Sequence, residues 1–172
     1  MRILSFLILL LLTGTVAAQV DNPFLQIKTD SLVMYDFVGG KGGDLSIVKD
    51  DGTLANAISK SVTLDKNVSL ELMHKLGSKK SYGQSVAACF DPHLGFVFYN
   101  KGKIVAHVTI CTGCNRLISS IDLKAQKQGE TISGNDNYYT GQGMSKSFRI
   151  FLNTLLKKHK FSHQIETERL SF

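Results

Sequence analysis

The sequence is poor in the residues and patterns that divide or anchor a chain. It has no tryptophan, and only two prolines, Pro23 and Pro92. No repeat, low-complexity tract or proline-rich linker interrupts it. No segment after residue 18 approaches the roughly 20 apolar residues that a transmembrane helix needs. We therefore expect residues 19–172 to form a single domain with its own hydrophobic core.

The first 18 residues have the three parts of a secretory signal peptide. Met1 and Arg2 give a short basic start, residues 3–12 are almost wholly apolar, and small residues close the stretch at Ala17 and Ala18. The apolar run is too short to span a bilayer. The pattern predicts an exported protein, periplasmic or secreted, that is cleaved after about Ala18.

The net charge and the absence of known catalytic motifs reduce the number of function classes that fit the sequence. The chain has 20 Lys and Arg against 14 Asp and Glu, so loss of Arg2 leaves 19 against 14, a net charge of +5. This mild excess does not indicate nucleic-acid binding. The chain lacks a Gly-x-Ser-x-Gly elbow and a His-Glu-x-x-His motif, and its glycine run at 39–43 lacks the ending of a P-loop. These absences favour a binding or structural role over catalysis.

Hydrophobic periodicity predicts an α+β fold. Runs of β-forming residues predict strands at 31–38, 45–48, 86–90, 96–99, 104–111 and 117–123. Apolar residues spaced three and four apart predict helices at 65–76 and 145–159. Residues 100–103 match a hairpin turn. We expect a mainly antiparallel sheet with a central hairpin, 95–111, packed by the amphipathic helix 145–159.

Alternation along the hairpin predicts that it is covered on both sides. One face would carry Ile104, Ala106, Val108 and Ile110. The other would carry Val105, His107, Thr109 and Cys111, beside Phe96 and Phe98. Both faces are rich in apolar groups, which is typical of a strand pair inside a covered sheet. His107 is interpreted as a packed histidine, since about 13 Å of strand separates it from Cys111.

The polar face of helix 145–159 is basic. It carries Lys146, Arg149, Lys157 and Lys160, and no acidic residue occurs between positions 136 and 166. One interpretation is a surface for an anionic partner such as lipid headgroups or polysaccharide. The other is a solvated face whose late lysines suit the C-terminal end of the helix dipole.

Three cysteines are the most specific feature of the chain. An odd number cannot pair completely within one exported molecule. If paired residue numbers in the hairpin sum to 203, the register sets Cys89 opposite Cys114 and Pro92 opposite Cys111. Pro92 cannot donate to a strand ladder, so we expect a bend or bulge beside it. All three cysteines should gather at the far end of one hairpin.

Three chemistries fit this cluster. The first is a disulfide, Cys89–Cys114 or Cys89–Cys111, with one thiol left over. The second is a zinc site made by Cys89, His93, Cys111 and Cys114, because a Cys₃His set suits tetrahedral zinc and a proline bend returns His93 toward Cys89. The third is a redox or nucleophilic Cys111-x-x-Cys114 pair. Thioredoxin-like proteins, however, have a cis-proline after their cysteines, and no proline follows Pro92.

The residues around the hairpin resemble a family. The matching residues are Ala88-Cys89-Phe90-Asp91-Pro92-His93-Leu94-Gly95-Phe96-Val97-Phe98-Tyr99, followed by Ile110-Cys111-Thr112-Gly113-Cys114-Asn115. They are similar to a family of uncharacterised exported bacterial proteins. The resemblance implies a bacterial periplasmic or secreted protein whose three cysteines belong to one local unit. It carries no activity and no functional residue over to this chain.

Two functions follow from the sequence. The favoured one is an exported, non-enzymatic binding or structural domain whose cysteine cluster is a disulfide or metal staple. The alternative is a thiol-dependent enzyme that uses the Cys111-x-x-Cys114 pair.

Overall fold

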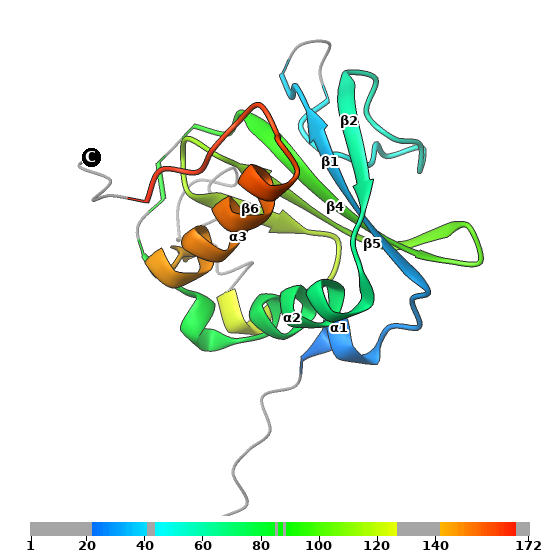
Figure 1. Ribbon diagram of the computed structural model, residues 1–172, viewed down its shortest axis with the longest axis horizontal. Helices are drawn as coiled ribbons and strands as arrows, with labels where there is room; N and C mark the ends of the chain where they lie inside the picture. Colours follow the sequence, from blue (N-terminus) through cyan, green and yellow to red (C-terminus); the bar gives the residue numbers. More distant parts are fainter. Residues whose placement is uncertain (1–21, 41–43, 85, 88, 127–141, 168–172) are drawn as a thin grey trace, which may run out of the picture.

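The computed structural model shows an antiparallel sheet with helices packed against one face (Figure 1). It describes residues 22–40, 44–84, 86–87, 89–126 and 142–167. Five strands form the sheet in the order β2-β1-β4-β5-β6. Their bounds are β1 (Ser31–Phe37), β2 (Ile58–Thr63), β4 (Pro92–Asn100), β5 (Lys103–Cys111) and β6 (Arg116–Ser119). The predicted α+β class, with its central hairpin, is confirmed.

In the part of the chain that the structure describes, three α-helices accompany the sheet, and a second sheet has two short strands. The helices are α1 (Pro23–Gln26), α2 (Lys66–Leu76) and α3 (Lys146–Lys158), and β3 (Tyr82–Gln84) pairs with β7 (Gly143–Met144). Two 3₁₀ turns, η1 (Lys79–Ser81) and η2 (Lys124–Gln126), complete the described elements. No helix in the described ranges is long and apolar enough to cross a membrane. The predicted signal peptide lies outside the described residues.

Helices α2 and α3 each begin directly after a residue whose side chain caps the first turn. The Asp65 side chain accepts a hydrogen bond from the Val68 N–H, and the Ser145 side chain accepts one from the Phe148 N–H. Such caps satisfy backbone donors that have no partner inside the first helical turn. Gly77 ends α2. Both predicted helices are therefore confirmed, with bounds close to those that periodicity indicated.

The sheet is covered on both faces, as predicted. One face carries the larger core, where Phe96 and Phe98 lie in the same cluster as α2 and α3 residues such as Leu72 and Leu152. On the other face, Ile47 from the 44–57 connection packs in a second cluster with residues of β1 and β4. The predicted strand at 45–48 is not formed, since only an isolated bridge from Val48 occurs there.

Two bulges in the central hairpin change its predicted register. Tyr99 faces Ile104 as predicted, but the register then shifts, so Phe96 faces Val108 and not His107. A one-residue shift exchanges the faces of a strand, and the predicted grouping of Phe96 with His107 is therefore wrong. A second shift, between Pro92 and Leu94, restores the predicted register, in which the numbers of paired residues sum to 203. Pro92 then lies opposite Cys111, as predicted.

Two short strands differ from the predictions. The strand predicted at 86–90 is absent from its described residues, and pairing occurs earlier, at β3. Strand β2 was not predicted, because its sequence Ile-Ser-Lys-Ser-Val-Thr alternates around a lysine and three hydroxyls. It lies at the edge of the sheet, where one face and one side of the ladder remain open to solvent.

Candidate functional site

A buried disulfide closes the turn between β5 and β6. Cys111 ends β5 and pairs with Arg116 at the start of β6. Within the turn Cys114 is joined to Cys111, with their Cα atoms 5.6 Å apart. The Cys114 N–H also lies 3.2 Å from the Cys111 sulfur. The two residues are 2% and 0% exposed, so solvent reaches neither sulfur freely.

The structure differs from both disulfide pairings that the sequence suggested. Cys89 is a free, exposed cysteine, and neither Cys89–Cys114 nor Cys89–Cys111 is formed. The hairpin ladder ends at Pro92, so its register does not extend to Cys89. The tight β5–β6 turn instead brings the two nearest cysteines together. Only two residues lie between them along the chain.

The predicted zinc tetrad is not assembled in this arrangement. Its cysteines Cys111 and Cys114 are bonded to each other. His93 points instead toward β1, where its Nδ1 lies 3.3 Å from the carbonyl oxygen of Phe37. Among the described residues, no three His, Cys, Asp or Glu side chains form a group that would hold a metal ion.

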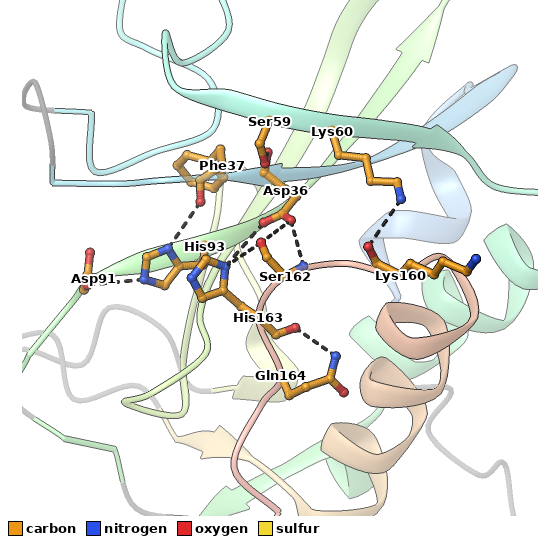
Figure 2. A network of polar contacts seen from close by, with 10 residues as sticks. All are labelled: Asp36, Phe37, Ser59, Lys60, Asp91, His93, Lys160, Ser162, His163 and Gln164. Atoms are coloured by element: carbon orange, nitrogen blue, oxygen red, sulfur yellow. Dashed lines mark hydrogen bonds and ion pairs between the residues drawn. The ribbon is translucent and has the colours of Figure 1, made fainter.

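A second polar cluster joins β1, β4 and the segment after α3 (Figure 2). Its centre is the Asp36 carboxylate on β1, only 4% exposed. Ser162 donates its N–H to Asp36 Oδ2 at 3.0 Å and its hydroxyl at 2.6 Å. His163 Nδ1 lies 3.4 Å from Asp36 Oδ1. Three polar groups therefore converge on one buried carboxylate.

Two histidines extend this cluster to the surface. The rings of His93 and His163 are stacked, with centroids 3.9 Å apart and an angle of 10° between the planes. His93 Nε2 lies 3.3 Å from an Asp91 carboxylate oxygen. His93 thus links the segment before β4 to the segment after α3 (Figure 2).

The electrostatics of Asp36 favour its ionised form. Burial by itself raises the pKa of this carboxyl, since a charged group loses solvation. The hydrogen bonds from Ser162 and the nearby His163 act in the opposite direction and prevail, so the pKa of Asp36 lies below its ordinary value. The carboxylate is therefore a charged anchor inside the fold.

The cluster contains the residue types of a hydrolase triad without a triad's geometry. In a triad, one histidine nitrogen faces the carboxylate and the other faces the serine. Here the Ser162 hydroxyl donates directly to Asp36, and the same Nδ1 of His163 lies near both groups, 3.2 Å from Ser162 Oγ. No proton route from serine through histidine to aspartate is formed. The arrangement instead holds the chain after α3 against the sheet.

Further bonds hold the same segment in place. Asn153 exchanges two hydrogen bonds with the backbone of Ile165, at 2.7 and 2.8 Å. Lys60 on β2 donates to the carbonyl of His159 at 2.6 Å. Phe161 is buried in the main core. Residues 159–165 therefore form a strap, defined here by these contacts, that connects the end of α3 to β1 and β2.

Sequence reasoning missed Asp36, Ser162 and His163. One signal was available, because Asp36 lies in an otherwise apolar strand, Ser-Leu-Val-Met-Tyr-Asp-Phe. A charge buried in such a strand needs a partner. The sequence does not show which of the distant polar residues supplies that partner.

The predicted basic face of α3 is wrong at Arg149. This residue is 2% exposed and lies in the interior, and burial lowers its pKa. Its guanidinium donates to Gln84 Oε1 at 2.7 Å, to the Met144 carbonyl at 3.1 Å and to the Thr167 carbonyl at 3.4 Å. Lys146, Lys157 and Lys160 are exposed as predicted. Arg149 faces inward, where it joins α3 to the small sheet and to Thr167, just beyond the strap.

A surface groove lies beside α2. Its volume is about 500 Å³. Its lining mixes apolar and polar side chains, among them Ile27, Asp30, Leu64, Lys66, Leu70 and Met73. Leu70 is 47% exposed at this position. The size is within the range of small-molecule sites in proteins.

Comparisons with protein-family models, with curated proteins and with solved structures find no match to this chain. The resemblance of the region around the cysteines to exported bacterial proteins therefore stays a sequence-based prediction. The evidence for a function is therefore the geometry of the disulfide turn, the strap and the groove.

Proposed function

We propose that this chain is an exported, non-enzymatic domain with a binding or structural role, in which the Cys111–Cys114 disulfide is a clasp of the fold. The observation that carries the proposal is the burial of both cysteines, at 2% and 0% exposure. A redox-active pair needs a sulfur that a partner can reach and a stabilised thiolate. Cys111 instead ends a central strand and lies among buried residues.

The strap supports the same proposal. Asp36 binds Ser162 directly, which makes the serine a structural donor and not a nucleophile activated by histidine. Export is supported by the signal-like residues 1–18 and by the presence of a disulfide, a bond typical of oxidising compartments.

The groove beside α2 favours binding over a purely structural role. It offers an apolar floor with Leu64 and Met73, and the charged side chains of Asp30 and Lys66 also line it. This is the usual composition of a site for a small ligand. Its lining contains no histidine or cysteine, and the hydroxyl of Ser31 donates to the carboxylate of Asp30 at 2.9 Å.

Thiol counting on purified residues 19–172 tests the clasp. We expect one thiol per chain to react with a maleimide in the native state, and three after unfolding with reductant. We also expect no catalysis of insulin reduction by dithiothreitol above the rate of a Cys111→Ser/Cys114→Ser variant. Insulin turnover that this double variant abolishes would establish the thiol-enzyme alternative. One zinc per chain with three protected thiols would establish the metal site instead.

Export has its own test. The full chain, expressed in a bacterium, should appear in the periplasm or medium with a new N-terminus near residue 19. A full-length protein retained in the cytoplasm would contradict this part of the proposal.

A further inference from the structure

The exposed thiol of Cys89 lies between two contacts with the disulfide turn. The Ala87 N–H donates to the carbonyl of Cys114 at 3.1 Å. Pro92 lies opposite Cys111 in the β4–β5 ladder. The chain around Cys89 is therefore held against Cys114 on one side and against Cys111 on the other.

Chain length limits how far Cys89 can lie from the disulfide. It follows Ala87 by two residues and precedes Pro92 by three. At about 3.3–3.6 Å per residue, its Cα is at most about 7 Å from that of Ala87 and about 11 Å from that of Pro92. A disulfide needs Cα atoms about 4.4–6.8 Å apart. Cys89 belongs to no helix or strand, so no regular hydrogen-bond ladder has to break for it to approach Cys114.

We propose that the three cysteines form a disulfide-exchange unit. The Cys89 thiolate attacks the Cys114 sulfur, a Cys89–Cys114 bond forms, and the Cys111–Cys114 bond breaks. Cys111 leaves as a thiolate and takes up one proton, which balances the proton that Cys89 gave up. One disulfide and one thiol exist before and after the step, so it consumes no oxidant or reductant. Cys114 is the target because the contact with Ala87 holds the Cys89 chain against it.

Exchange changes the position of the odd thiol. Before the step the free sulfur belongs to Cys89, which is exposed; afterwards it belongs to Cys111, which is 2% exposed. The attacked sulfur is also buried, so the β5–β6 turn must open locally for the reaction. The unit thus shields a reactive thiol from other molecules while it keeps the turn cross-linked. This role goes beyond the clasp, which by itself gives Cys89 no function.

Tryptic peptides distinguish the two bonded forms without reduction. Cleavage after Lys80, Lys101, Lys103 and Arg116 places Cys89 on peptide 81–101 and the other two cysteines together on peptide 104–116. The Cys111–Cys114 form therefore gives two separate peptides, and the Cys89–Cys114 form gives one cross-linked pair. Wild-type protein is held under argon at about pH 8 and quenched in acidic denaturant that contains maleimide, which exposes and labels every free thiol; its monomer fraction is then digested and analysed by mass spectrometry.

We expect the cross-linked pair to appear with time and reach a constant fraction, with the maleimide on Cys111 in that pair. The monomer fraction excludes disulfides between molecules. If the monomer shows only the intrapeptide Cys111–Cys114 bond after long incubation, the exchange is disproved. That result would leave the clasp untouched, because insulin turnover and thiol counting test the clasp separately.

A variant without Cys111 measures at equilibrium how readily Cys89 and Cys114 come together. In Cys111→Ser, only Cys89 and Cys114 remain to pair. The matched control is Cys89→Ser/Cys111→Ser/Ser61→Cys, which moves the exposed thiol to β2. In a glutathione buffer we expect the first protein to form its disulfide with an effective concentration at least about tenfold above that of the control. Equal values in two proteins of native circular dichroism would disprove the proposal; if either variant unfolds, the wild-type peptide map decides.

Discussion

The Asp36 carboxylate accepts both the backbone N–H and the hydroxyl of Ser162, a residue 126 positions later in the chain. This contact joins β1, the second strand in the sheet order, to the strap that follows α3. It also places an ionised carboxylate inside the fold, where the hydrogen bonds that it accepts stabilise its charged form. One buried charge therefore helps to hold the strap, and its contribution can be measured.

Removing the charge of Asp36 should loosen the strap. Hydrogen bonds to charged groups contribute about 1.5–3 kcal/mol each, and we expect Asp36→Asn to lower the free energy of unfolding by about 2 kcal/mol. Urea denaturation followed by circular dichroism measures the change. Asp51→Asn is the matched control, since the Asp51 carboxylate also accepts two hydrogen bonds but only from Thr53 in an exposed turn. Equal effects of the two substitutions would contradict the role assigned to Asp36.

The contribution of Asp36 should also depend on pH. Its pKa is lowered in the folded protein, so its stabilisation is complete above the unfolded-state pKa of about 3.9 and is lost as the pH falls through the lower folded value. The difference in unfolding free energy between wild type and Asp36→Asn should therefore be constant near neutral pH and shrink below about pH 4. A difference that stays the same down to pH 2 would show that the charge is not responsible.

Loss of the clasp should destabilise the domain moderately. The disulfide closes a very short loop, for which chain entropy gives about 2 kcal/mol. For a domain of this size, the Cys111→Ser/Cys114→Ser variant should melt about 5 °C lower in calorimetry. Cys89→Ser is the control and should melt within about 1–2 °C of wild type, because an exposed free cysteine contributes little. A larger loss from Cys89→Ser than from the double variant would reject the clasp.

Gly95 should not accept a side chain. A Cβ added there would lie 2.6 Å from the Cβ of Ile47, which packs in the second core. Overpacking of this kind costs about 1–3 kcal/mol, and we expect Gly95→Ala to lower the unfolding free energy by that amount. Gly113→Ala is the control, since a Cβ at Gly113 would meet nothing within 4 Å. It should change stability by less than about 0.5 kcal/mol in the same urea titration.

Arg149 should act as an interior residue and not as part of a basic surface. Arg149→Met would remove the donors to Gln84, Met144 and Thr167, although the Met144 carbonyl still accepts a hydrogen bond from Asn115. Hydrogen bonds to charged groups contribute about 1.5–3 kcal/mol each, so thermal unfolding should reveal a loss of about 2 kcal/mol. Lys157→Met, on the exposed side of the same helix, should change stability by less than about 0.5 kcal/mol. Similar small effects at both positions would restore the surface interpretation.

Local patterns in the sequence predicted much of the fold. Asp65, Gly77 and Ser145 mark helix ends because capping depends on residues within one turn of each other. The turn at Lys101-Gly102 is formed as expected, with positive φ at both residues. Hairpin geometry likewise predicted Pro92 opposite Cys111, and the pairing is formed because the two register shifts cancel.

Tertiary contacts decided the details that give the site its chemistry. The bulge beside Tyr99 reversed which faces meet in the hairpin, and the β5–β6 turn paired Cys111 with Cys114. Asp36 found its partner in Ser162 only through the path of the chain after α3.

The sequence by itself therefore determined the α+β class, the capped helices and the neighbourhood of the three cysteines, because each depends on periodicity or on residues close along the chain. Only the tertiary structure decided the disulfide pair, the inward position of Arg149 and the Asp36 anchor. Arg149 and Asp36 depend on packing between distant segments, and the disulfide depends on the path of the β5–β6 turn, which the hairpin register does not predict.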